Sequence, residues 1–193
     1  MARVVARVRI DPVAERWRGV RGDLVLVFAN WLLRWPGHRF RLLVLRSLMG
    51  VEVGESTSVE RGVRLLTRGG VAIGANTNIN RDVVLDGRGG LRIGAGVNLS
   101  PEVLLLTAEH DVTSPEFEGV AAPVVVGDRC WIATRAIVLP GTTVGTGAVV
   151  GAGTVVRGVV TADTVVVSAP ARQVHIRPGE AQTTLAAYRR WLH

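Results

Sequence analysis

The sequence predicts a mainly β fold, a parallel β-helix of about five triangular coils. From Val53 to about Ala162, an aliphatic residue that is often followed by glycine returns every six positions. Six residues are too few for a helix and its turn, so the repeat is not helical. The chain is 48% hydrophobic but only 5% aromatic and contains 23 glycines, which indicates a core of small aliphatic side chains and many tight corners.

Each six-residue unit is interpreted as a short strand followed by a corner. Its aliphatic residue points inward, and a glycine or small residue accommodates the bend. Three units make one coil, and stacking the coils pairs each strand with its equivalents above and below at ~4.8 Å. With coil starts at Val53, Ile73, Ile93, Val126 and Val144, we expect coils of 20, 20, 33, 18 and 18 residues.

The amino-terminal segment 1–50 differs from the rest of the chain in charge. It holds ten arginines against three acids, a net charge of +7, whereas residues 51–193 hold thirteen of each and sum to zero. Residues 15–49 predict two helices interrupted at "WPGH", and the favoured interpretation is a cap over the unpaired strand edges of the first coil. Because tryptophan and arginine favour anionic headgroups, peripheral membrane contact through residues 15–49 is the open alternative.

We therefore expect a helical cap (1–50), a β-helix (51–177) with a loop insertion (110–125), and a short carboxyl-terminal helix in the tail (178–193). The apolar run in the cap is far shorter than the ~20 residues that span a bilayer, and no signal peptide is evident. This predicts a cytoplasmic protein, peripheral at the inner membrane face if the helices contact lipid. The single cysteine, Cys130, excludes an intrachain disulfide and a cysteine metal cluster. Nucleic-acid binding is not expected, because the excess charge lies in an apolar helical segment and not along a groove.

The repeat stops at His110, in "LLLTAEHDVTSPEFEG", and resumes at "VVVGDRCW". A loop that leaves a rigid scaffold costs ordering entropy, so such loops usually carry a function. A neutral imidazole, with a pKa near 6.5, is suited to removing a proton from a substrate hydroxyl at neutral pH. From spacing alone, a loop histidine that merely bonds to backbone is an equal alternative.

Three stretches carry a family resemblance: "HD…PEF…APVVVGDRCWIATRAIVLPG", "VGAGTVV" and "SAPAR". They resemble the hexapeptide-repeat acyltransferases, and within them the sugar O-acetyltransferase branch, nearest to the colanic-acid-type acetyltransferases of polysaccharide biosynthesis. The resemblance covers roughly residues 30–177. It implies that the β-helix is left-handed and that the protein is a homotrimer. It also implies acetyl-CoA as cosubstrate, no metal, and a carbohydrate or small-molecule acceptor. The sequence departs from the family at Ser168 and Ala169, where the family usually has glycine and asparagine.

The resemblance implies that His110 is the catalytic base and that Asn80, in "NTNINRD", approaches the catalytic centre. Asn80 lies seven residues into its coil, and His110 lies seventeen into the next. The two are therefore expected on different sides of the prism, where they meet only across a threefold interface between subunits. Asp111 and Glu109 either orient the imidazole or cap the loop.

The coenzyme side is predicted from stacking. Thr134 and Ala152 differ by eighteen residues, one coil, and a further eighteen leads to Pro170. By resemblance, this corner bonds the pantetheine arm of acetyl-CoA, Trp131 lines the pocket, and the Thr134 N–H is the candidate oxyanion donor. The candidate ligands for the nucleotide phosphates are Arg157, Arg172 and Arg177.

The leading hypothesis is an acetyl-CoA-dependent O-acetyltransferase that acts on a carbohydrate or glycosylated small molecule. An N-acyltransferase on an amino sugar or natural product, and a non-catalytic β-helix scaffold, are the alternatives. A γ-type carbonic anhydrase needs three histidines around zinc, and His110 is the only histidine between residues 53 and 170.

Overall fold

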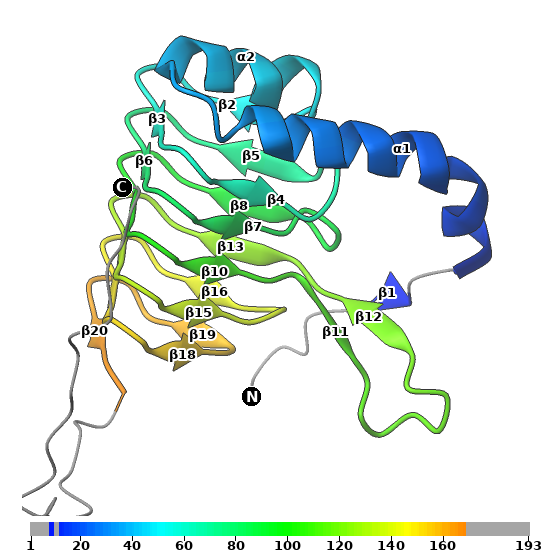
Figure 1. Cartoon of the computed structure of the whole chain (residues 1–193). Helices are drawn as coiled ribbons and strands as arrows, with labels where there is room; N and C mark the ends of the chain where they lie inside the picture. The colour runs from blue at the N-terminus through cyan, green and yellow to red at the C-terminus, as the bar shows by residue number, and fades with distance from the viewer. Residues whose placement is uncertain (1–7, 10–11, 169–193) are drawn as a thin grey trace, which may run out of the picture.

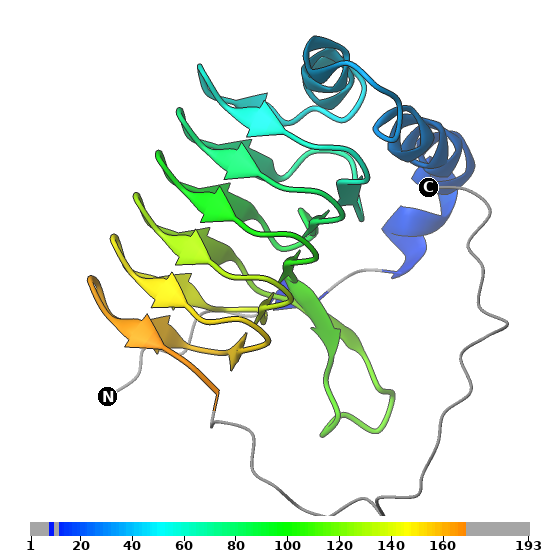
Figure 2. The same cartoon turned by 60° about the vertical axis from the view of Figure 1, so that its left-hand side comes forward.

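The computed structural model describes residues 8–9 and 12–168, and these form a β-helix with two helices across one end (Figure 1). The helices α1 (Pro12–Leu32) and α2 (His38–Ser47) come first, and the chain then winds away from them coil by coil. Turning the molecule shows the coils stacked as parallel layers (Figure 2).

Three parallel sheets form the faces of the prism. The first sheet contains β2 (Glu52–Val53), β5 (Val71–Ile73), β8 (Leu91–Ile93), β13 (Val124–Val126), β16 (Thr143–Val144) and β19 (Val159–Val160). The second contains β3 (Ser58–Val59), β6 (Asn78–Ile79), β9 (Asn98–Leu99), β14 (Trp131–Ile132), β17 (Val149–Val150) and β20 (Val165–Val166). The third contains β4 (Arg64–Leu65), β7 (Val84–Leu85), β10 (Leu104–Leu105), β15 (Ile137–Val138) and β18 (Val155–Val156). The predicted parallel β-helix is confirmed, with about six coils instead of five.

The register stacks one aliphatic side chain of each strand above the next. In the third sheet Leu65 pairs with Leu85, Leu85 with Leu105, and Leu105 with Val138, and these four side chains are fully buried. Alternate residues of the strands face outward. The core is therefore a set of vertical ladders, which explains why the sequence uses small aliphatic residues and so few aromatic ones.

The last coil corrects the predicted spacing. Val144 pairs with Val160, which makes this coil 16 residues long instead of the expected 18. The reason is a short corner: only two residues, Arg157 and Gly158, separate β18 from β19. Gly158 has φ +85°, a conformation that glycine adopts without steric cost, and its carbonyl accepts a bond from Thr143 N–H.

The two helices close the open edge of the first coil with polar side chains. Each of the three strands of the first coil receives one hydrogen bond to its backbone from a different side chain of the helices. The bonds run from Asn30 Nδ2 to Leu65 O (2.9 Å), from Arg41 Nε to Val59 O (2.8 Å) and from Arg46 Nη2 to Val53 O (2.9 Å). Backbone groups at a sheet edge would otherwise be unpaired, so the helices supply what a preceding coil would have supplied.

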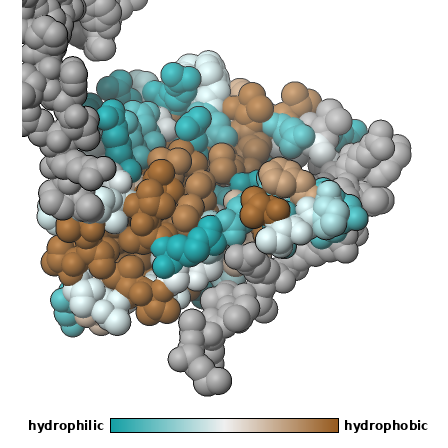
Figure 3. Space-filling view, turned by 90° about the horizontal axis from the view of Figure 1, so that it is seen from below, coloured by the Kyte–Doolittle hydropathy of each residue, from teal (hydrophilic) through white to brown (hydrophobic). Residues whose placement is uncertain are grey.

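The far end of the β-helix presents apolar side chains (Figure 3). Val155, Val159, Val165 and Val167 of the last coil are each more than half exposed. The carboxyl-terminal helix expected at 178–193 lies outside the described residues, so its prediction is not tested. No helix in the described part of the chain is long and apolar enough to cross a bilayer.

Replacing Arg41 with methionine should lower the free energy of unfolding by about 1–3 kcal/mol, because a buried carbonyl of Val59 loses its donor while the apolar stem is kept. Arg41 also donates to Trp35 O (3.0 Å), so two acceptors are affected. Urea denaturation of Arg41→Met and of the control Arg39→Met, whose side chain on the same helix is exposed, measures the difference. Equal midpoints for the two variants would contradict the capping role.

Candidate active site

The insertion after the third sheet forms an arm that projects from the prism (Figures 1 and 2). Its strands β11 (Ala108–His110) and β12 (Gly119–Ala121) pair antiparallel, with His110 opposite Gly119. A third strand, β1 (Val8–Arg9), pairs with the outer side of β12. The sequence analysis missed β1, although the alternation of apolar residues and arginine in "RVRI" is typical of an edge strand.

The arm is rooted on a buried carboxylate. Asp86 has no exposed surface, and its Oδ2 accepts a bond from Thr107 N–H (2.9 Å), three residues before His110. The Thr107 hydroxyl donates in turn to Asp86 O (3.0 Å) and accepts from Gly89 N–H (2.9 Å). The return strand joins the same cluster, because Ala122 N–H donates to Thr107 O (2.8 Å). Both ends of the arm are therefore held at one point.

Arg88 keeps the Asp86 carboxylate charged. Burial alone would raise the pKa of Asp86, but hydrogen bonds from the Arg88 guanidinium and from the backbone of Thr107 and Arg88 outweigh it, and the pKa is lowered. The guanidinium contact is bidentate, at 2.9 and 3.0 Å. The sequence analysis did not select Asp86; its only signal was an acid placed directly after an aliphatic strand in "VVLDGRGG".

His110 is exposed on the arm and is held by Phe117. Its Nδ1 lies 2.8 Å from Phe117 O, and the two rings stack with centroids 4.5 Å apart and planes within 5°. A carbonyl oxygen only accepts, so Nδ1 carries the hydrogen, and in the neutral ring the free lone pair is on Nε2. Phe117 has φ +49°, a conformation uncommon for a bulky residue, which turns its carbonyl toward the imidazole. The residue expected as base is thus presented in the tautomer that a base requires.

The neighbours of His110 fix the arm. Glu109 forms a bidentate ion pair with Arg157, at 3.0 and 2.5 Å, and this carboxylate raises the pKa of the Arg157 guanidinium. Asp111 Oδ1 accepts bonds from the N–H and the hydroxyl of Thr113, at 2.9 and 2.6 Å. These bonds of Asp111 are those of a loop cap. Its catalytic role, and the contact of Arg157 with a phosphate, stay predictions.

Asn80 lies at the corner between the second and third sheets, after β6. Its Nδ2 donates to Asn98 Oδ1 (3.1 Å) and to Leu99 O (2.7 Å) on the next coil. His110 belongs to the arm, which begins beyond the third sheet. In the single chain the two residues therefore stand on elements at different corners, and their meeting across subunits stays a prediction.

The predicted coenzyme corner contains Trp131, Thr134 and Ala152. Trp131 faces outward from β14, is half exposed, and donates its indole N–H to Ser100 Oγ (2.9 Å). Thr134 and Ala152 are both exposed and stack as expected, since Trp131 pairs with Val149 and Gly153 N–H bonds Thr134 O (2.9 Å). No hydrogen bond from Thr134 N–H to another described residue is formed, so this donor is available to a ligand.

One step of the predicted stacking is wrong. Because the last coil has 16 residues, the residue below Ala152 is Ser168 and not Pro170. Ser168 N–H is bonded to Thr154 Oγ1 (3.0 Å). Ala169, Pro170, Arg172 and Arg177 lie outside the described residues, so their roles are not tested.

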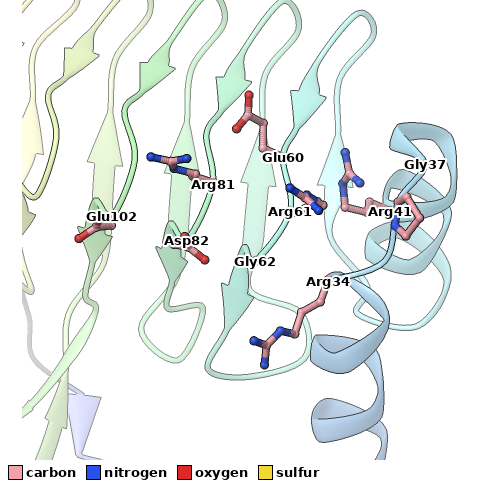
Figure 4. Close-up of a pocket in the computed structure, with 10 residues that line it drawn as sticks. Arg34, Gly37, Arg41, Glu60, Arg61, Gly62, Arg81, Asp82 and Glu102 are labelled. Atoms are coloured by element: carbon pink, nitrogen blue, oxygen red, sulfur yellow. The ribbon is translucent and has the colours of Figure 1, made fainter. Parts of the chain in front are cut away.

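A shallow cleft of about 890 Å³ lies along the same corner as Asn80, under the link between the helices (Figure 4). Its charged lining is Arg34, Arg41, Glu60, Arg61, Arg81, Asp82 and Glu102. His110 does not contribute to this lining. A group of three or more histidine, cysteine, aspartate or glutamate side chains that would suit a metal is absent from the described residues.

Comparisons with known proteins agree with this architecture. Residues 123–158 match the family described as bacterial transferase hexapeptide (six repeats). A hexapeptide-repeat-containing acetyltransferase from Vibrio cholerae superposes with a TM-score of 0.69 at 28% identity, over 80% of this chain and 91% of that one. Residues 123–158 thus carry the hexapeptide repeat of this family. Like its structural neighbours, this chain folds as a left-handed β-helix.

Two further groups of relatives are named for transfer reactions. A maltose O-acetyltransferase from Clostridium difficile has a TM-score of 0.68 at 29% identity, over 79% of this chain and 84% of that one. A protein named as a colanic acid biosynthesis acetyltransferase of Escherichia coli is 50% identical over 48 residues, 25% of this chain and 26% of that protein. A lipopolysaccharide biosynthesis O-acetyl transferase of the same organism is 46% identical over 52 residues, 27% of this chain and 26% of that protein. The chain thus matches about a quarter of the length of these curated relatives.

Replacing Arg157 with alanine should loosen the arm, because the Glu109 carboxylate loses its bidentate partner. An exposed pair of this kind contributes about 0.2–1 kcal/mol, so amide exchange in residues 108–121 should rise by about 1.4- to 5-fold. Hydrogen exchange read by mass spectrometry measures this. The control is Arg135→Ala, which removes the exposed Arg135–Glu102 pair (2.7 Å) elsewhere on the prism and should leave the arm unchanged. An equal rise in both variants would contradict the assignment of the Arg157–Glu109 pair as the contact that holds the arm.

Replacing Asp86 with asparagine should lower the free energy of unfolding at pH 7 by about 1–3 kcal/mol, because buried donors lose a charged acceptor. The folded-state pKa of Asp86 lies below the ordinary value of 3.8, so its stabilisation is present above that value and is lost as the pH falls through the folded-state pKa. Urea midpoints should therefore differ at pH 7 and converge in acid. Asp23→Asn, at an exposed position on α1, is the control. A difference that persists unchanged at pH 2 would contradict the account.

Proposed function

We propose that this protein is an acetyl-CoA-dependent O-acetyltransferase that acts on a hydroxyl of a carbohydrate or a glycosylated small molecule. The single observation that carries the proposal is the His110–Phe117 contact, which engages Nδ1 and leaves Nε2 as the basic nitrogen of the neutral, exposed ring on a clamped arm. The relatives named as O-acetyltransferases support the reaction class. A neighbour from Vibrio cholerae was solved with acetyl coenzyme A, at 25% identity, which supports the cosubstrate.

In the proposed step, Nε2 of His110 removes the proton of the acceptor hydroxyl. The hydroxyl oxygen attacks the carbonyl carbon of the thioester at the same time. The tetrahedral intermediate then collapses, the carbon–sulfur bond breaks, and the proton passes from the imidazolium to the leaving thiolate. The Phe117 carbonyl faces the Nδ1 hydrogen throughout, so it stabilises the imidazolium when the ring is charged. No residue needs to form a covalent intermediate.

The corner of Thr134 and Ala152 is suited to the thin arm of the coenzyme. Both residues are small and exposed, so a ligand can approach the backbone closely, and the Thr134 N–H is a donor for the oxyanion. Trp131 adds a half-exposed apolar ring beside this corner. We assign Arg157, together with Arg172 and Arg177, to the nucleotide phosphates. For Arg157 this contact competes with its pair to Glu109.

We infer a site shared between subunits of a homotrimer. Asn80 and His110 stand at different corners of one prism, and a threefold arrangement is the simplest way to bring Asn80 of the partner subunit to the arm. The cleft beside Asn80, with its mixed charges, then lies next to the acceptor. A cytoplasmic location would supply acetyl-CoA. O-transfer is favoured over N-transfer because two of the relatives reported above, at 29% and 46% identity, are named for transfer to oxygen.

Replacing His110 with alanine should reduce acetyl transfer by about 10²–10⁴-fold, the usual contribution of a general base. Release of free thiol from acetyl-CoA, measured against a panel of sugars and nucleotide sugars, reports the reaction. His38→Ala, at an exposed position at the start of α2, is the matched control and should retain activity.

Turnover that survives in His110→Ala would place the base elsewhere. A wild-type protein that neither binds nor consumes acetyl-CoA would favour a non-catalytic scaffold instead.

A further inference from the structure

Helix α1 is apolar on two opposite faces. The inner face packs on the first coil through Leu26, Ala29 and Leu33, the last two with no exposed surface. The outer face exposes half or more of each of its apolar side chains. These are Leu24 (65%), Val27 (68%), Phe28 (54%) and Trp31 (50%). A helix that is hydrophobic all round is normally buried, so the outer face is built for contact with something else.

The exposed side chains form one continuous stripe. Their spacing of three and four residues places them on one line of the helix, and Trp35 continues that line beyond its end. The rings touch in sequence: the centroids of Phe28 and Trp31 lie 5.8 Å apart, and those of Trp31 and Trp35 lie 5.1 Å apart. On α2, Leu43 is 60% exposed. Folded monomers rarely expose so large a contiguous apolar patch without a function.

Positive charge borders this stripe. At 3.6 residues per turn, the exposed side chain of Arg21 falls at one edge of it. The segment 1–50 as a whole carries ten arginines against three acids. The occupant of the outer face therefore has to offer an apolar region to the stripe and negative charge at the boundary of that region.

A second copy of this chain fits that description less well than a lipid surface does. Residues 51–193, which form the β-helix and the tail, have equal numbers of arginines and acids, so they offer no net negative charge to the arginines. A bilayer with anionic headgroups offers both an apolar layer and the charge. Trp and Arg side chains favour that boundary region.

We propose that the outer face of α1, defined by Leu24, Val27, Phe28, Trp31 and Trp35, docks on the surface of a membrane that contains anionic phospholipids. The rings enter the headgroup region, and Arg21 at the edge of the stripe pairs with a phosphate. The helix lies in the interface and does not cross it, in keeping with its length and hydropathy. The inner face keeps its capping role, so the cap and the docking site are two faces of one helix. This inference does not depend on acetyl transfer.

Cosedimentation with vesicles tests the proposal on the full chain. The vesicles contain equal parts of phosphatidylglycerol and phosphatidylcholine, or phosphatidylcholine alone. The variant Phe28→Glu/Trp31→Glu changes two half-exposed rings and leaves the inner face intact. The control Val159→Glu/Val165→Glu adds the same charge at two exposed valines of the last coil.

The wild type and the control should sediment with the anionic vesicles, and the α1 variant should bind at least about tenfold more weakly. Binding should fall as salt rises and should be weaker to phosphatidylcholine alone. A wild type that stays in solution with anionic vesicles overturns the proposal, as does an α1 variant that binds equally well. Light scattering on the same samples tests the alternative occupant, a second copy of the chain. If the wild type does not bind vesicles and the α1 variant has a smaller oligomeric mass than the wild type, the outer face is an interface between copies.

Discussion

The requirement that every coil be hydrogen-bonded on both sides governs this molecule. A parallel β-helix satisfies it internally by stacking, but its first coil has no predecessor. Here the cap replaces the missing coil with one polar side chain per strand, Asn30, Arg41 and Arg46. Because the helices are fixed to the coil by these bonds as well as by apolar packing, the outer face of α1 holds a set position relative to the prism.

The same requirement explains where the chain can depart from the repeat. An extra residue inserted inside a strand would break the register of the ladders, so additional residues leave at a corner. The largest departure begins at Thr107 and returns at Ala122, and both bond near the buried Asp86. Such an anchor lets a projecting arm carry His110 without losing its geometry. The arm then needs only local contacts, the Phe117 carbonyl and the Glu109 pair, to orient the imidazole.

The sequence analysis predicted the features that depend on local periodicity. Inward residues such as Ile79 and Leu99 recur at the six-residue spacing. The insertion was detected because this spacing stops at His110. It missed the features that depend on contacts far apart in the chain. The 16-residue last coil follows from the conformation of Gly158, which a count of hexads does not detect. Likewise, nothing local indicated that Arg157 would meet Glu109, 48 residues earlier.

The pairing of β1 with β12 has a consequence for biosynthesis. Val8 pairs with Ala121, so β1 finds its partner only after 113 further residues have been made. At about 5–20 residues per second this takes roughly 6–23 s. In that interval β1 is an unpaired edge next to helices that can already fold, and it is open to association with other chains. The strand β1 is thus paired only once the return strand of the arm has been made, although β1 precedes both helices and all three sheets of the prism in the chain.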